Sequence, residues 1–378
     1  MDGNVSLADF SDTLITSFKE RDPKRHNVRA KRPHEGRDAR HGDGNTRKRD
    51  RRSEVRSLNA GMHPRNVFKG NPPNFEELAR QDADLRKVLR ANGSVDFDHP
   101  LANFYLARAL LKQNFDLTLQ LPTNRLCPGI PGRLNYIHWI EDLLEVSRHA
   151  SRRSKSAAGA AVSTEEVLGF DIGTGASCIY PLLGCRLHSN WKFIATDIDD
   201  ESLEWAMDNV DNNMLSDRID LRQASRHTWL VDYIHRSEQG DKQSADKFLD
   251  FCMCNPPFFA SLEEAQQNRR AGCAGALHEF IYSRSDVSPA VADSIRAVAG
   301  RANVDLDSDS SDIGGEVLFI MGIICDSLLL QGRVTWYTSL VGKKSSLKVL
   351  CSLPPRRMRS SCRPPSAVRR APCIRRSW

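Results

Sequence analysis

The sequence predicts an α/β fold built on a parallel sheet, and three observations support this prediction. From Val167 onward, short apolar segments alternate with segments of helical periodicity, which is typical of strands joined by crossover helices. Two of these apolar segments end in glycines or acidic residues, which suits ligand binding beyond strand ends. A chain of 378 residues with 40% hydrophobic content can also bury a substantial core.

The predicted elements of the sheet follow one another along the chain. Strands are expected in "VLGFDIGTGAS", where the strand runs into glycines, in "WKFIATDIDD", where it ends in acids, and in "IDLRQAS", "FLDFCMCNPPFF" and "GRVTWYTSLVG". The segment "ESLEWAMDNVDNNML" is an expected helix. The apolar segment Val317–Leu330 is too short to cross a membrane and contains Asp326, so we expect a buried helix. Residues 260–315, acidic and rich in serine, are expected to form a flexible insertion.

A smaller helical part precedes the sheet. Asn74 followed by Glu76 and Glu77 predicts a helix N-terminus, and residues 101–115 and 137–146 predict two further helices. Residues 151–164 are of low complexity and are expected to form a loop. We therefore expect an N-terminal module at 61–150 and a larger domain at 151–350.

The net charge of +6 comes from the two ends of the chain. Residues 1–60 are poor in apolar side chains and are predicted to form a disordered basic extension, and residues 351–378 form an arginine- and proline-rich tail. Basic segments on an acidic body favour nucleic acid or a nuclear import receptor as partner, and Arg47–Arg52 resembles a nuclear localisation cluster. A merely solvated tail is the alternative.

The ten cysteines include no C-x-x-C pair and no cluster with zinc spacing, so no metal site is predicted. Cys252 and Cys254 are two residues apart on a predicted strand, so both should face the same side of the sheet. We expect buried, reduced thiols and, because no signal peptide is evident, a reducing compartment.

The glycine-rich segment "FDIGTGAS" follows the first strand. A dinucleotide site would require a third glycine where Cys178 stands, so Asp171, Gly173 and Gly175 better match S-adenosylmethionine. Asp197, at the end of the next strand, could accept both ribose hydroxyls; Asp199 and Asp200 are better placed as helix caps. The alternative is an ordinary tight turn without a ligand.

The segment "NPPFF" follows the fourth strand. The amide oxygen of Asn255 and the carbonyl of Pro256 could accept the two hydrogens of an exocyclic adenine amino group. Pro256 and Pro257 would fix the direction of that carbonyl, and Phe258 would stack on the base. The alternative is a strand that simply ends at two prolines.

Together, "HPRN", "PPNFEELA", "RLNYIHWIEDLL", "DIGTGASCIYPLLG", "NPPFF" and "GKKSSL" resemble the methyltransferase-like protein 16 family over residues 62–350. The resemblance implies a class I, Rossmann-like methyltransferase fold with an N-terminal RNA-binding module. It also implies methylation of adenosine N6 in U6 small nuclear RNA or a similar hairpin, with S-adenosylmethionine as cofactor. The implied location is the nucleus, with the cytoplasm as a second compartment.

The resemblance assigns roles to individual residues. Asn255, Pro256, Pro257 and Phe258 would be catalytic. The cofactor would contact Arg133, Asp171, Gly173, Gly175, Asp197, Thr228 and Asn255. RNA would contact Arg65, Asn66, Lys69, Lys343 and Lys344, although Val67 departs from the arginine that the animal enzymes carry.

The family pattern stops near Leu350. We therefore expect the last helix and the closing β-hairpin to be missing, and hypothesise that the tail comes from a shifted reading frame or an unspliced intron. Two rival functions follow: an RNA-binding protein without activity, and methylation of DNA adenine or of a protein glutamine. The "MHPRN" and "RLNYIHW" segments argue against the second rival.

Overall fold

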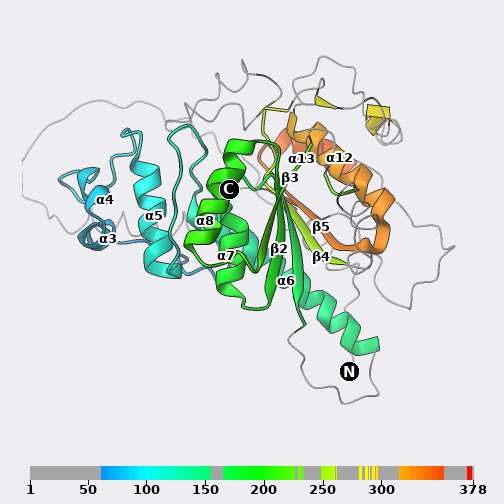
Figure 1. Ribbon diagram of the computed structural model, residues 1–378, viewed down its shortest axis with the longest axis horizontal. Coiled ribbons are helices and arrows are strands. Elements are labelled where there is room, and N and C mark those ends of the chain that lie inside the picture. The colour runs from blue at the N-terminus through cyan, green and yellow to red at the C-terminus, as the bar shows by residue number, and fades with distance from the viewer. Residues whose placement is uncertain are drawn as a thin grey trace, which may run out of the picture. The chain divides into compact units, whose positions relative to one another are not determined.

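A computed structural model describes residues 61–154, 165–225, 229–231, 233, 248–259, 261, 281–282, 286–287, 289, 292–293, 295–296, 315–352 and 373–376 (Figure 1). All of these residues belong to one compact unit, which begins at Arg52. The expected insertion at 260–315 and the basic extension at 1–60 lie largely or wholly outside the described residues, as does Thr228.

A parallel sheet forms the centre of the molecule. Its strands are β1 (Val167–Ile172), β2 (Trp191–Asp197), β3 (Ile219–Gln223), β4 (Leu249–Cys254), β5 (Val334–Val341) and β6 (Cys373–Arg376). Their order is β3-β2-β1-β4-β5-β6, and every neighbouring pair is parallel. The winding direction therefore reverses between β1 and β4, where open α/β sheets bind ligands.

Helices cover both faces of the sheet, as the apolar strands require. The helices α7 (Ile179–Leu187) and α8 (Asp200–Asn212) contact β2, and α8 also contacts β3. The helices α12 (Gly315–Leu330) and α13 (Lys344–Ser352) contact β5 and each other (Figure 1). Cys252 and Cys254 both pack in the cluster that contains α12, which confirms that they share a face and are free thiols.

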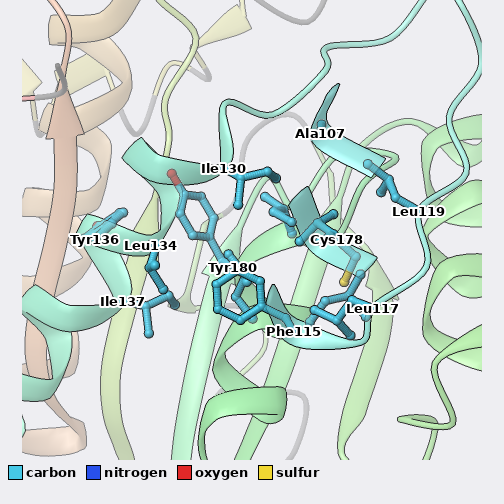
Figure 2. Close-up of a cluster of buried hydrophobic side chains, with 14 of the residues drawn as sticks. Ala107, Phe115, Leu117, Leu119, Ile130, Leu134, Tyr136, Ile137, Cys178 and Tyr180 are labelled. Carbon is cyan, nitrogen blue, oxygen red and sulfur yellow. The ribbon is translucent and has the colours of Figure 1, made fainter. Parts of the chain in front are cut away.

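The N-terminal helices are α3 (Phe75–Gln81), α4 (Ala83–Lys87), α5 (Ala102–Phe115) and α6 (Ile130–Ser154). The side chain of Asn74 accepts a hydrogen bond from the Glu77 amide, so the predicted N-cap of α3 is confirmed. Side chains of α5, α6 and α7 meet in one apolar cluster, in which Leu117, Leu134, Tyr136 and Tyr180 lie together (Figure 2). The proposed domain boundary near residue 150 stays a prediction.

Two expectations about the chain were wrong. Residues 151–154, expected in a loop, continue α6, because a helix can extend through arginines and serines once its first turns are packed. The last helix, which we expected to be missing, is present as α13, and one further strand, β6, follows it; the described residues contain no closing β-hairpin. Strand β6 is only four residues long and pairs through its backbone with the edge of β5, so no side-chain periodicity announces it.

An ionic cluster fastens the start of the described chain to α6 and α7. Glu141 accepts hydrogen bonds from His138 at 3.0 Å and from His188 at 2.9 Å, and His63 lies 2.9 Å from Asp142. Burial alone would raise the pKa of Glu141, but the hydrogen bonds and charges of His138 and His188 lower it well below its ordinary value. The ionised carboxylate is therefore the form that stabilises the fold.

Replacing Glu141 with glutamine should lower the free energy of unfolding at pH 7 by about 2 kcal/mol, the worth of hydrogen bonds to a charged group. Because the folded-state pKa is lowered, this stabilisation is complete above the ordinary value of 4.5 and declines as pH falls below it. In thermal melts from pH 7 to pH 3.5, the difference in melting temperature between the two proteins should therefore stay constant down to about pH 4.5 and narrow below it. The exposed Glu204 provides the control, and equal losses for Glu204→Gln and Glu141→Gln would contradict the assignment.

Candidate active site at the carboxyl ends of β1, β2 and β4

The parallel register places three predicted motifs side by side. Ile172 of β1 lies opposite Cys254 of β4 and opposite Thr196 of β2. The next residues along these strands are Gly173, Asn255 and Asp197, so the glycine turn, the Asn-Pro-Pro-Phe segment and the acidic residue converge at one edge. Gly173 and Asp197 are 24 residues apart in the sequence and Gly173 and Asn255 are 82 apart, and the sheet brings all three together.

The turn after β1 requires glycine for its backbone conformation. Gly173 has φ +71° and Gly175 has φ +63°, and a Cβ at either position would meet no atom within 4 Å. Glycine is therefore needed at these positions for the left-handed backbone and not to avoid a steric clash, and the turn faces open space. The Gly175 amide donates to Asp197 at 2.8 Å, which ties this turn to the end of β2.

Asp197 is held at the end of β2 by backbone amides. Its second oxygen accepts a hydrogen bond from the Asp199 amide at 3.1 Å, and burial raises its pKa although these bonds oppose the shift. Asp199 caps α8 by accepting from the Ser202 amide, as predicted, and also accepts from Arg125 at 2.7 Å. Arg125 is almost fully buried and also reaches Glu201, so it joins the segment before α6 to the start of α8.

Asp171 is the most unusual acidic residue of this edge. It is fully buried, and neither carboxylate oxygen accepts a hydrogen bond that satisfies normal geometry within the described part of the chain. Burial is the main reason that the pKa of Asp171 is raised to about 7, and the negative charge of Asp197 raises it further. The Thr174 hydroxyl and the positive charge of Arg133 act in the opposite direction and lower the pKa. A buried carboxylate without partners is the feature expected where a cationic ligand group supplies the missing contacts.

Arg133 reaches this edge from α6. Its guanidinium donates to the Tyr180 hydroxyl at 2.6 Å and lies 5.3 Å from the centre of the same ring. Tyr180 of α7 thus holds the Arg133 side chain in place, close enough for its charge to act on Asp171. The contact of Arg133 with a cofactor stays a prediction.

The Asn-Pro-Pro-Phe segment that follows β4 is largely shielded from solvent. Asn255 is half-buried, and its side-chain oxygen is buried without a hydrogen-bond partner in the described chain. Pro256 is buried, whereas Pro257 and Phe258 are half-buried. An amide oxygen deprived of both water and protein donors is suited to accept a hydrogen from a ligand.

Tyr136, which was not predicted as a site residue, binds the end of β4 just before Asn255. Its hydroxyl accepts a hydrogen bond from the Cys254 amide at 3.3 Å and lies 2.7 Å from the Thr338 hydroxyl, which donates to the Cys252 carbonyl. Tyr136 is buried against Tyr180 (Figure 2). A polar atom on the apolar face of α6, within "RLNYIHW", was the signal that could have identified it.

The predicted RNA residues differ in their surroundings. Asn66 is buried and donates to Asn135 and to the Pro131 carbonyl, so it shapes the N-terminal segment. Arg65 is half-exposed and pairs with Glu141 and Asp142. Lys69 and Lys344 are exposed, whereas the Lys343 ammonium lies 5.2 Å from the Phe259 ring. Burial argues against RNA contact only for Asn66.

Within the described residues, no group of histidine, cysteine and acidic side chains could hold a metal ion. Nor does that part of the chain contain a helix long and apolar enough to cross a membrane.

Comparisons with known proteins agree with this geometry. A family model described as RNA methyltransferase matches residues 56–354. The RNA N(6)-adenosine-methyltransferase mettl16 of Xenopus laevis is 38% identical over 298 residues, 78% of this chain and 47% of the relative. The U6 small nuclear RNA (adenine-(43)-N(6))-methyltransferase of Caenorhabditis elegans is 36% identical over 300 residues, 78% of this chain and 56% of the relative. The chain thus spans about half the length of these relatives.

Solved structures show the same fold. The human METTL16 catalytic domain in complex with MAT2A 3′UTR hairpin 1 aligns with a TM-score of 0.58 at 34% identity, covering 77% of this chain and 85% of that one. The N-terminal domain of human METTL16 in complex with SAH aligns with a TM-score of 0.55 at 34% identity, covering 77% and 87%. The fold is therefore that of a Rossmann-like methyltransferase, and the chain belongs to the RNA methyltransferase family that its motifs indicated, that of methyltransferase-like protein 16.

Proposed function

We propose that this chain transfers a methyl group from S-adenosylmethionine to adenosine N6 in a structured RNA, with U6 small nuclear RNA or a similar hairpin as substrate. The observation that carries the proposal is the unpartnered Asn255 oxygen beside Pro256, at the edge where Asp171 and Asp197 also lie. The names of the relatives, which act on RNA adenosine and on U6 RNA, support the substrate class. A nuclear location follows from such a substrate, and the cytoplasm stays a second candidate.

The residues present fit this cofactor. The Asp171 carboxylate offers two unpaired oxygens to a cationic amino group, and Asp197 stands at the end of β2, where a ribose would present its hydroxyls. The open space beside Gly173 and Gly175 would admit the cofactor, and Arg133, held by Tyr180, would contact it. When bound, the cofactor would supply an electrophilic methyl group on sulfur.

The chain's own residues would prepare the nucleophile. The amino nitrogen of adenine is weakly nucleophilic because its lone pair is delocalised into the ring. The Asn255 oxygen and the Pro256 carbonyl would each accept one amino hydrogen, which localises the lone pair on nitrogen and aims it toward the methyl group. Phe258 would hold the extruded base by stacking, and the proton would leave to water after transfer.

The first test is incubation of the protein with U6 RNA and isotopically labelled cofactor, followed by mass analysis of the nucleosides. Asn255→Ala and Pro256→Ala should each lower the rate by at least about 100-fold, the usual cost of one preorganised acceptor or donor, with RNA affinity retained. A U6 RNA with guanosine at the target position provides the substrate control. Substantial turnover by either variant would contradict the mechanism, and RNA binding without cofactor binding in the wild type would favour the inactive rival.

Cofactor affinity should depend on pH through Asp171. Because burial raises its pKa to about 7, acidification below pH 7 protonates Asp171 in the free protein, and the cationic cofactor should bind more weakly. Calorimetric titrations at pH 6, 7 and 8 would measure this, and Asp171→Asn should flatten the profile. Methylthioadenosine, which lacks both cationic groups, is the control ligand; an equal pH dependence for it would contradict the role of Asp171.

Lysines outside the catalytic edge should contribute salt-dependent RNA affinity. Lys69→Ala and Lys344→Ala, at exposed positions, should each reduce the slope of log affinity against log salt by about 0.7–0.9. Lys87, which is paired with Asp84 at 2.7 Å, provides the matched control. If Lys87→Ala changes the slope as much as the other two substitutions, these lysines do not form a specific RNA surface.

A further inference from the structure

Helix α12 carries two buried carboxylates that each hold a loop. Glu316, fully buried, accepts hydrogen bonds from the consecutive backbone amides of Gly342 and Lys343, the latter at 3.3 Å. Asp326, ten residues along the same helix, accepts from the consecutive amides of Leu230 and Val231 at 2.8 and 3.2 Å. The expected function uses neither carboxylate, so each requires an explanation for its burial.

The turn that Glu316 holds is in contact with Phe258. A Cβ placed on Gly342 would lie 2.7 Å from Cδ1 of Phe258 and 3.2 Å from the Glu316 carboxylate. The ring therefore packs against the bare backbone of Gly342, at a distance that only glycine permits. The position of the Gly342 backbone consequently limits where the Phe258 ring can lie.

The first turn of α12 also packs against the backbone of Phe259, the residue after Phe258. A Cβ on Gly315 would lie 2.3 Å from the Phe259 carbonyl oxygen and 2.2 Å from that of Tyr282. On the other side, the Lys343 ammonium lies 5.2 Å from the Phe259 ring centre. Glu316 is thus at the junction of three backbones: the start of α12, the turn after β5 and the segment after β4.

We propose that Glu316 is a positioning residue for the target adenine: by holding Gly342 against Phe258, it fixes the ring on which the base stacks. This inference rests on the proposed function and deepens it. The expected catalytic groups bind or contact the adenine, whereas Glu316 acts only through the Gly342 turn.

The contacts of Glu316 require two acceptor oxygens. Burial raises its pKa, whereas the Gly342 amide, the Ser346 side chain, and the amide and charge of Lys343 favour the ionised form. Glutamine has the same shape but one acceptor, so its NH₂ group would face one of the two backbone amides. Glu316→Gln should therefore release one end of the turn without leaving a cavity.

The test measures adenine placement directly. With 2-aminopurine at the target position of U6 RNA, stacking on Phe258 should quench the fluorescence of this base in the wild-type complex. In the Glu316→Gln complex, at least about half of the quenched fluorescence should return. Single-turnover methylation at saturating RNA and cofactor should slow by about 10-fold, in the range caused by small misplacement of a reacting group. The dissociation constant for S-adenosylmethionine should stay within about twofold.

Asp326→Asn provides the matched control. It removes a buried carboxylate on the same helix that also accepts from two consecutive amides, those of Leu230 and Val231, whereas Glu316 holds the Gly342 turn that packs against Phe258. It should leave the 2-aminopurine signal unchanged. An equal change in that signal for both variants would show general loosening of α12 and overturn the proposal.

A double-mutant cycle with Phe258→Leu separates positioning from stability. If Glu316 acts through the ring, adding Glu316→Gln to Phe258→Leu should cost less than about twofold in rate. The same 10-fold loss in both backgrounds would overturn the proposal. Should Glu316→Gln melt far below the wild type, Gly342→Ala keeps the carboxylate but pushes on the ring, and an unchanged 2-aminopurine signal in it would also overturn the proposal.

These outcomes are distinguishable from failure of the proposed function. Wild-type protein that binds the RNA but leaves its nucleosides unmodified refutes methylation. Wild-type protein that methylates U6 RNA while Glu316→Gln matches it in rate and fluorescence refutes only the role of Glu316.

Discussion

The register of β1 with its two neighbours is the constraint on which the rest of the site depends. Because Ile172 is level with both Thr196 and Cys254, the three strands end together, and the residues that follow them share one edge. A slip of one residue in either pairing would turn the alternate side chains to the opposite face and separate Asn255 from Asp171. Apolar side chains on both faces fix this register, since each face packs against its own set of helices.

Polar atoms left without partners mark where the ligands belong. Asp171 and Asn255 keep buried oxygens unsatisfied within the described chain, while the neighbouring amides of Gly175, Asp199 and Cys254 all find acceptors. A fold that leaves buried oxygens of Asp171, Thr174 and Asn255 without partners at one edge is stabilised less than it could be, which is typical of a binding site. Nearby segments are held by hydrogen bonds of Tyr136 to the Cys254 amide, of Arg125 to Asp199 and of Glu316 to the Lys343 amide.

Much of this site could be predicted from the sequence, because local patterns report strands, turns and caps. The glycines of "DIGTGAS", the carboxylate of Asp197 and the "NPPF" segment all lie at strand ends, where periodicity places them. Tertiary contacts could not be predicted in the same way. Glu316 looks like an ordinary acid in the first turn of a helix, and Asn66 looks like a polar surface residue, yet both are buried. Strand β6 depends on the free edge of β5 and not on its own sequence.

The central claim is that the Asn255 oxygen and the Pro256 carbonyl hold the amino group of an extruded adenine over the cofactor. A crystal structure of this protein with a U6 hairpin and S-adenosylhomocysteine would measure it. We expect the adenine N6 to lie within about 2.7–3.2 Å of both oxygens, with its ring against Phe258. An ordered adenine that leaves the Asn255 oxygen unpaired, or a cofactor away from Asp171 and Asp197, would contradict the account.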